Sequence, residues 1–188
     1  MKINKDLIYL TIIIGLIASC AQLYYTFQFK PSWQAKQASQ ITVVYNKEVS
    51  ANELVIDEIR QANQFVNFAI YTFTRTDIKD ALIAAKYRGL QVKGVVDKEQ
   101  TDKIEEQKSI ITEMTNAGIP IVFDDHSGIM HLKVLVTDKS YVSGSYNWTA
   151  SATTSNDEVL EIGHEESVRL MYKRLTDKLF NKYSASSL

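Results

Sequence analysis

The 188-residue chain is poor in several features that would decide its class at once. It has a single cysteine, Cys20, which excludes an intramolecular disulfide and a zinc site built from cysteines. It also lacks an excess of charge of either sign, since 21 basic residues face 22 acidic ones and the formal net charge is −1. Without an overall basic field, any site for an anion must be local.

Long apolar runs are also missing, except at the start of the chain. Lys2 and Lys5 precede the uncharged stretch Leu7–Phe27, which is long enough to span a bilayer as a helix. We expect residues 1–27 to be an export signal or, preferably, a retained membrane anchor with the domain outside. Two alternatives are a simple cleaved signal and a lipoprotein signal with Cys20 lipidated, and a buried helix fits less well. The protein is then exported, to the periplasmic or cell-envelope side of a bacterium, either membrane-anchored or secreted.

The rest of the chain alternates between strand and helix patterns. Residues 28–40 are polar, contain Pro31 and predict a linker. Strands are expected over 41–45, 65–73, 90–97, 119–124, 131–138, 140–145 and 157–163, and helices over 50–62, 77–88, 102–116 and from about 168 to 179. Strands separated by helices predict an α/β sandwich with a largely covered sheet, in one domain over residues 41–184.

One apolar stretch, MHLKVLVTDKSYVSGSYNW (Met130–Trp148), carries charged and polar residues. In a strand, His131 and Lys133 project from the same face, while the residues between and after them face the core. Ser145 and Asn147, also two apart, follow the second arm of a predicted hairpin that turns at Asp138 and Lys139. Imidazole is a nucleophile and proton carrier near neutral pH, and the other groups donate to phosphate oxygens.

These residues resemble the signature of the phospholipase D superfamily, H-x-K-x4-D followed by G-S-x-N. The matching residues are His131, Lys133, Asp138, Gly144, Ser145 and Asn147. Five residues separate Asp138 from Gly144 where the family usually has six, which predicts a tighter hairpin. Residues 69–98 and 147–162 also resemble the small, single-motif bacterial endonuclease branch and its mitochondrial relatives. The resemblance covers about 41–183 and implies a phospholipase D-like αβα sandwich with a mixed β-sheet.

The resemblance implies a phosphodiesterase that needs neither a metal nor another cofactor. His131 would attack phosphorus to form a phosphohistidine, and a second histidine would protonate the leaving oxygen and then activate water. Lys133 and Asn147 would bind phosphoryl oxygens, with Ser145 assisting. Glu158 matches the carboxylate that orients a histidine ring. Asp138 belongs to the catalytic motif and is expected to have a mainly structural role in the hairpin.

The motif occurs once, but the chemistry needs two histidines. His126 and His164 lie outside any such motif. Two copies of the chain related by a two-fold axis would bring two His131 rings together, so we expect a homodimer with one shared active site.

Three substrate hypotheses stay open at this point. An endonuclease acting on DNA or RNA is favoured by the branch that the sequence resembles. A phospholipase D acting on lipid head groups uses the same chemistry, and a membrane anchor would bring it to its substrate. A catalytically idle, membrane-tethered module that binds nucleic acid is the third. For nucleic acid, a dimer could present Lys79, Lys86, Arg88 and Lys93 as a local stripe, and Tyr71 could stack on bases or pack in the core.

Overall fold

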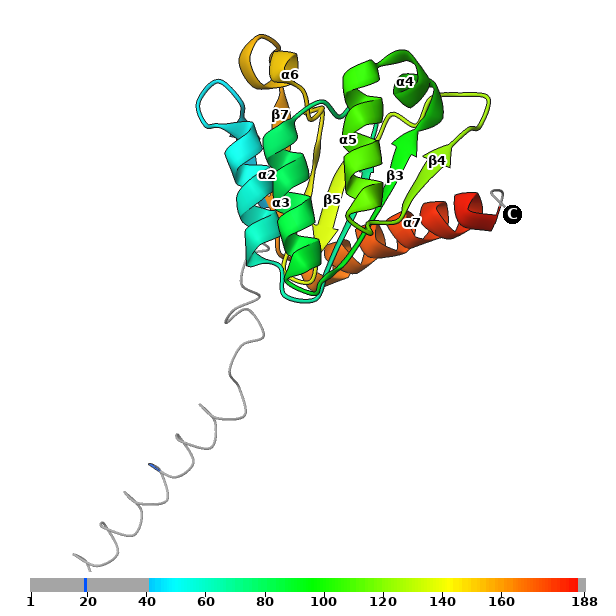
Figure 1. The fold of residues 1–188 in the computed structure, drawn as a ribbon. Helices are drawn as coiled ribbons and strands as arrows, with labels where there is room; N and C mark the ends of the chain where they lie inside the picture. The colour runs from blue at the N-terminus through cyan, green and yellow to red at the C-terminus, as the bar shows by residue number, and fades with distance from the viewer. Residues whose placement is uncertain (1–18, 20–40, 186–188) are drawn as a thin grey trace, which may run out of the picture. The chain divides into compact units, whose positions relative to one another are not determined.

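The computed structural model describes residues 41–185, together with Ser19. Seven strands form one sheet in the order β1-β7-β6-β5-β2-β3-β4 (Figure 1). The strands are β1 (Ile41–Tyr45), β2 (Phe65–Ile70), β3 (Gln91–Asp97), β4 (Ile121–Asp124), β5 (Lys133–Thr137), β6 (Tyr141–Gly144) and β7 (Val159–Gly163). β2, β3 and β4 run parallel, and the remaining neighbours pair antiparallel. The predicted mixed sheet is confirmed.

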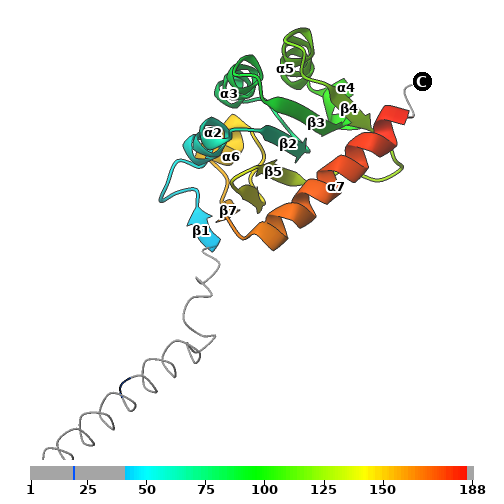
Figure 2. The ribbon, with the colours of Figure 1, turned by 90° about the horizontal axis from the view of Figure 1, so that it is seen from below.

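Helices cover both faces of this sheet (Figure 2). The helices α2 (Ala51–Gln61), α3 (Thr76–Tyr87) and α5 (Glu105–Asn116) lie on one face, and α7 (Glu166–Ala185) crosses the other. Short helices α4 (Lys98–Lys103) and α6 (Ala150–Thr154) follow β3 and precede β7. The larger core cluster fills the space under α2, α3 and α5, and a smaller one around Ala69 and Val95 lies under α7. The αβα sandwich is therefore confirmed.

The central strands are built from residues that suit burial on both sides. β2 is buried from Val66 to Ile70 because β3 and β5 flank it and helices cover both faces. Such strands are near-continuous apolar runs, as the sequence of β2 is. At the edge, β1 buries a single side chain instead: Val44 enters the core while the other four residues are exposed.

Two predicted elements described here differ in extent, and a third differs in how its start is capped. The helix expected over 102–116 is two helices, because Asp97 caps α4 and the extended Ile104 separates α4 from α5. The strand expected over 65–73 ends at Ile70, and the chain then pairs with the segment around Trp148. The predicted start of α2 is confirmed, but the Ser50 hydroxyl donates to Asn52 Oδ1 at 2.8 Å instead of capping the backbone.

The predicted anchor, cleavage site and linker, residues 1–40, lie outside the described residues apart from Ser19. Within residues 41–185, no helix has both the length and the apolar character that crossing a membrane requires.

Candidate active site

Five of the six residues of the predicted motif, all except Asp138, gather around one open hollow. The start of β5, the end of β6 and the start of β7 meet there. The hollow is lined by His131, Lys133, Gly144, Ser145, Asn147, Glu158 and Val159. The sequence thus predicted these lining residues, but it did not predict how His131 reaches the hollow. β5 begins at Lys133, so His131 precedes the strand and reaches the same hollow from a turn in which its N–H donates to the Ile129 carbonyl at 3.0 Å.

Gly144 allows the chain to turn toward the hollow. Its φ is +145°, and a Cβ there would lie 2.1 Å from the Val159 carbonyl oxygen. With no side chain in the way, the Ser145 N–H donates to that carbonyl at 3.0 Å, and the Val159 N–H donates to Ser145 Oγ at 3.1 Å. The close approach of β6 to β7 therefore places Ser145 beside Glu158.

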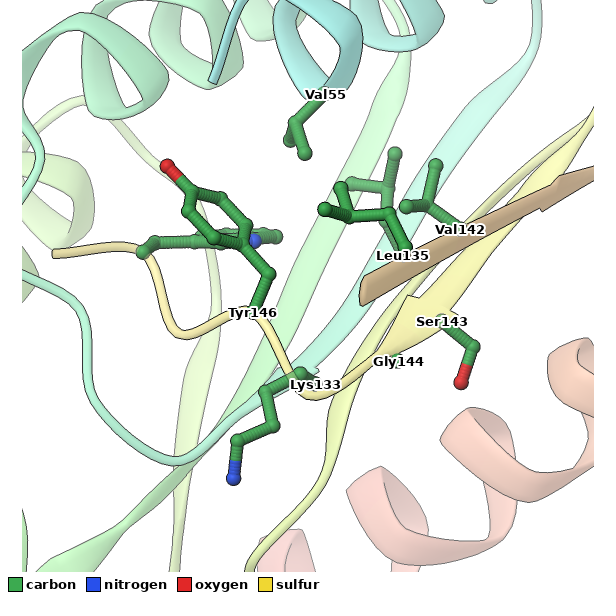
Figure 3. A pocket seen from close by; sticks show the side chains of 9 residues that line it. Val55, Lys133, Leu135, Val142, Ser143, Gly144 and Tyr146 are labelled. Atoms are coloured by element: carbon green, nitrogen blue, oxygen red, sulfur yellow. The ribbon is translucent and has the colours of Figure 1, made fainter. Parts of the chain in front are cut away.

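Lys133 is nearly buried, with 7% of its surface exposed. Figure 3 shows its ammonium pointing away from a small cavity whose lining includes Val55, Leu135 and Val142. Nζ donates to the His131 carbonyl at 3.0 Å and lies 5.1 Å from the centre of the Tyr71 ring. Burial lowers the pKa of Lys133, and the negative charge of Glu158 partly opposes that shift. A poorly solvated ammonium with protons to spare is suited to bind a phosphoryl oxygen.

Glu158 is buried and heavily engaged. The Ser145 hydroxyl donates to its Oε2, and Asn156 Nδ2 donates to Oε1 at 3.1 Å. Its own N–H donates to Asn46 Oδ1 at 2.9 Å. The expected hydrogen bond from the His131 ring to the Glu158 carboxylate is not found within residues 41–185; the His131 ring instead contacts Tyr71. Within one chain, Glu158 thus positions Ser145 rather than the imidazole.

Comparison with known proteins identifies the family of this chain. The family model described as "Cardiolipin synthase, PLD-like domain" matches residues 55–179, which is most of the chain. The chain belongs to the phospholipase D superfamily.

Several members of this superfamily are similar in sequence or structure. The Mitochondrial cardiolipin hydrolase of Chlamydomonas reinhardtii is 26% identical over 68% of this chain and 56% of its own length. The Phospholipase D of Rickettsia bellii is 31% identical over 64% of this chain and 59% of its own length. The chain therefore spans less than two thirds of either relative. Nuc from Salmonella typhimurium superimposes with a TM-score of 0.71 at 30% identity, over 76% of this chain and 94% of that one.

Asp138 lies away from the hollow of this phospholipase D-like domain. Its Oδ1 accepts the backbone N–H groups of Asn63 (2.8 Å) and Gln64 (3.0 Å). It follows the last residue of β5, roughly 16 Å along the strand from Lys133. Burial raises the pKa of Asp138, but these hydrogen bonds and the Lys139 ammonium at 3.4 Å together bring it below its usual value. Although Asp138 was predicted within the catalytic set, its contacts are those of the structural role: it ties the hairpin turn to the loop before β2.

The other two histidines of the domain are elsewhere. His126 Nδ1 contacts Asp124 Oδ1 at 2.5 Å after β4, and it lines a separate acidic hollow with Asp97. His164 Nδ1 lies 3.3 Å from the Lys139 carbonyl, near the Asp138 turn. Neither lines the hollow with His131. Among residues 41–185 no group of three or more histidine, cysteine or acidic residues could hold a metal ion.

Sequence reasoning missed several supports of the site. Tyr71 was weighed as a base-stacking or core residue, yet its ring contacts both His131 and Lys133. Asn46, which is distant in sequence, holds the 152–158 segment in place. Its Nδ2 donates to the Ala152 and Asn156 carbonyls at 2.7 and 2.9 Å. A buried asparagine after a strand gives no sign of its partner, which lies more than 100 residues away.

Proposed function

We propose that the protein hydrolyses phosphodiester bonds through a phosphohistidine, in a homodimer that shares one active site. The observation that carries the proposal is the set of His131, Lys133, Ser145 and Asn147 around one open hollow. These groups include a nucleophile, His131, and hydrogen-bond donors on Lys133 and Asn147, which is what attack on a phosphate diester requires. The superfamily to which the chain belongs supports the assignment.

In the proposed reaction, an unprotonated nitrogen of His131 attacks phosphorus and the bond to the leaving oxygen breaks. The leaving oxygen takes a proton from a second imidazole. That imidazole then removes a proton from water, the water oxygen attacks phosphorus, and the N–P bond breaks to release a phosphomonoester. Lys133 and Asn147 hold the non-bridging oxygens as their charge changes.

The second imidazole is supplied by another copy of the chain. His126 and His164 do not line the hollow, so the proton donor in this scheme is His131 of the partner subunit. A two-fold axis beside the hollow brings the two rings together.

An exposed apolar face adjoins the hollow and suits such a contact. We call it the β1–β7 patch and define it by the exposed side chains of Ile41, Val43, Tyr45 and Val159. Alternation along β1 and the pairing of Tyr45 with Val159 place all four on one face of the sheet, opposite Val44. Val159 belongs to both the patch and the hollow. A second copy seated on the patch therefore lies next to the chemistry.

Nucleic acid is the substrate that we propose first. The hollow is open and five of its seven lining residues have polar side chains, which suits a diester whose chain continues on both sides. The basic stripe that the sequence suggested for a dimer finds no support within one chain. Lys79 of α3 pairs with Glu113 of α5 on one face of the sheet. Lys93 of β3 pairs with Asp177 of α7 on the opposite face, at 2.8 Å. We therefore assign the phosphate contacts to the residues that line the hollow.

A phospholipase D acting on lipid head groups is the second candidate, favoured by the names of the relatives from Chlamydomonas and Rickettsia. The full chain is incubated in EDTA with single-stranded DNA, duplex DNA, RNA, and vesicles of phosphatidylcholine or cardiolipin. Cleavage of a nucleic acid supports the first proposal, and cleavage of lipid alone replaces it with the second. If the folded protein cleaves none of them, the hydrolase proposal fails and an idle binding module takes its place.

The shared site has its own test. His131→Ala chains are mixed with wild-type chains under conditions in which subunits exchange, and activity per wild-type chain is measured. Because each productive site needs two imidazoles, activity should fall as the fraction of His131→Ala chains rises. An active wild-type monomer, or activity that stays constant per wild-type chain, would contradict the dimer.

We also propose that residues 1–27 direct the domain across a membrane and anchor it there. The proposal rests on the lysines and the uncharged stretch of the N-terminal sequence. Fractionation of bacterial cells that express the full chain should recover it in the membrane fraction, accessible to protease from the outer side. Recovery in the cytoplasm would overturn it.

A further inference from the structure

Tyr71 lies beside the two side chains of the site that can carry a positive charge, His131 and Lys133. It follows the last residue of β2, and its ring centre lies 4.8 Å from that of His131, with the ring planes at 67°. The Lys133 ammonium lies 5.1 Å from the same ring centre. We propose that Tyr71 is a positioning residue, whose ring sets the His131 imidazole and the Lys133 ammonium relative to the phosphoryl group. The inference rests on the proposed phosphodiesterase function.

Tyr71 is itself held by three hydrogen bonds, one to its ring hydroxyl and two to its backbone. Its hydroxyl accepts a hydrogen bond from Gln100 Nε2 of α4 at 2.7 Å. Its backbone N–H donates to the Leu132 carbonyl at 2.9 Å, and its carbonyl accepts from the fully buried Gln107 at 3.4 Å. An aromatic ring fixed at its tip and at its backbone can serve as a rigid surface for its neighbours.

One carboxylate ties this ring support to the segment that carries His131. Asp97, the last residue of β3, accepts the N–H of Gln100 on Oδ1 at 2.8 Å and the N–H of Met130 on Oδ2 at 2.9 Å. Gln100 holds the Tyr71 hydroxyl, and Met130 directly precedes His131. The ring and the imidazole are therefore positioned from the same buried residue.

An aromatic contact has a chemical advantage here over a hydrogen bond. No hydrogen bond to a ring nitrogen of His131 is found within residues 41–185, so the Tyr71 contact restrains the imidazole and leaves both nitrogens for attack and proton transfer. The face of the Tyr71 ring attracts the Lys133 ammonium in the same way, without accepting one of its protons. Those protons remain available to phosphoryl oxygens.

The kinetic test uses the full chain and the simple diester bis(4-nitrophenyl) phosphate. We expect Tyr71→Leu to lower kcat about 10- to 100-fold with KM changed less than about 3-fold, because the misplaced groups act in the chemical step. Tyr71→Phe keeps the ring and should stay within about 3-fold of wild type. The matched control is Phe180→Leu, which removes a half-buried ring 4.8 Å from the Lys93 ammonium on the other face of the sheet and should leave kcat unchanged. Equal kcat values for Tyr71→Leu and wild type would overturn the inference.

A second measurement does not depend on activity or on the Leu variant's stability. The imidazole ¹H–¹³C NMR signals of the three histidines are recorded for wild type, Tyr71→Phe and Gln100→Ala, and for Tyr71→Leu if its melting curve is cooperative. Loss of the ring in Tyr71→Leu should shift the His131 signals most, and loss of the hydroxyl contact in Tyr71→Phe or Gln100→Ala should shift them less, while the signals of His126 and His164 stay in place. Unchanged His131 signals overturn the inference, even if the wild-type protein proves inert. An inert wild type with shifted His131 signals would instead refute the proposed function alone.

Discussion

At the scale of single residues, Lys133 serves the proposed reaction but lowers the stability of the folded protein. Only 7% of the Lys133 surface is exposed, and among the described residues its ammonium donates one hydrogen bond, to the His131 carbonyl. A buried charge without a full set of partners destabilises the folded state. Residues kept for function often carry such a cost, and their replacement separates activity from stability.

For Lys133→Met we expect kcat/KM to fall at least about 100-fold, since the phosphoryl charge loses its main cation. The free energy of unfolding at neutral pH should rise by roughly 1 kcal/mol. The sign follows from the lowered pKa: folding disfavours the protonated lysine, so the wild type is penalised below that pKa and relieved as the pH rises through it. The gain of the variant should therefore shrink in alkaline buffer. Urea unfolding at several pH values measures it, and a variant less stable than wild type at neutral pH would contradict the prediction.

The sequence predicted the residues of the site better than their contacts. His131, Lys133, Ser145, Asn147 and Glu158 could be assigned because the local sequence around them resembles the signature of the superfamily. The role of Tyr71 could not, since it depends on β2 lying antiparallel to β5. The pairing of Ser145 with Glu158 likewise depends on the register of β6 against β7.

At the scale of elements, the turn at Gly144 joins β6 to the site. Both its positive φ and the nearness of the Val159 carbonyl exclude a side chain. For Gly144→Ala we expect a loss of about 2–4 kcal/mol of unfolding free energy, because strain and a backbone clash add. Gly89→Ala is the matched control: φ is +91°, but the space is open, so a loss of only about 1 kcal/mol is expected. Equal losses in the two variants, measured by urea unfolding, would show that the close approach contributes nothing.

Element boundaries were predicted where local chemistry decides them and missed where tertiary contacts do. The turn at Asp138 and Lys139 was recognisable, because short polar turns between apolar runs form hairpins. The break at Ile104 was not, since the apolar spacing continues through it while the Asp97 cap starts α4 earlier in the chain.

At the scale of the whole molecule, the proposed dimer makes the β1–β7 patch a functional surface. Val43 is 64% exposed in the single chain, so Val43→Lys should fold normally. In the dimer the added ammonium would be buried without a partner, and we expect the dimer dissociation constant to rise at least about 30-fold. Activity per chain should fall in parallel at low protein concentration. Sedimentation and a dilution series measure both effects.

The matched control for this surface is Tyr87→Lys. Tyr87 is 76% exposed at the end of α3, away from the patch. It should change neither assembly nor activity. A Val43→Lys protein that behaves like Tyr87→Lys would place the dimer contact elsewhere.

The pairing of β1 with β7 joins the first and last strands of the sheet in sequence, and this affects how the protein is made. While the chain emerges from the ribosome, β1 has no neighbour until almost all of the domain has been synthesised. Contacts that close such long loops form late and slow folding. The β1 edge of the sheet is therefore expected to be completed late in synthesis, which would suit the export of an unfolded chain that we propose.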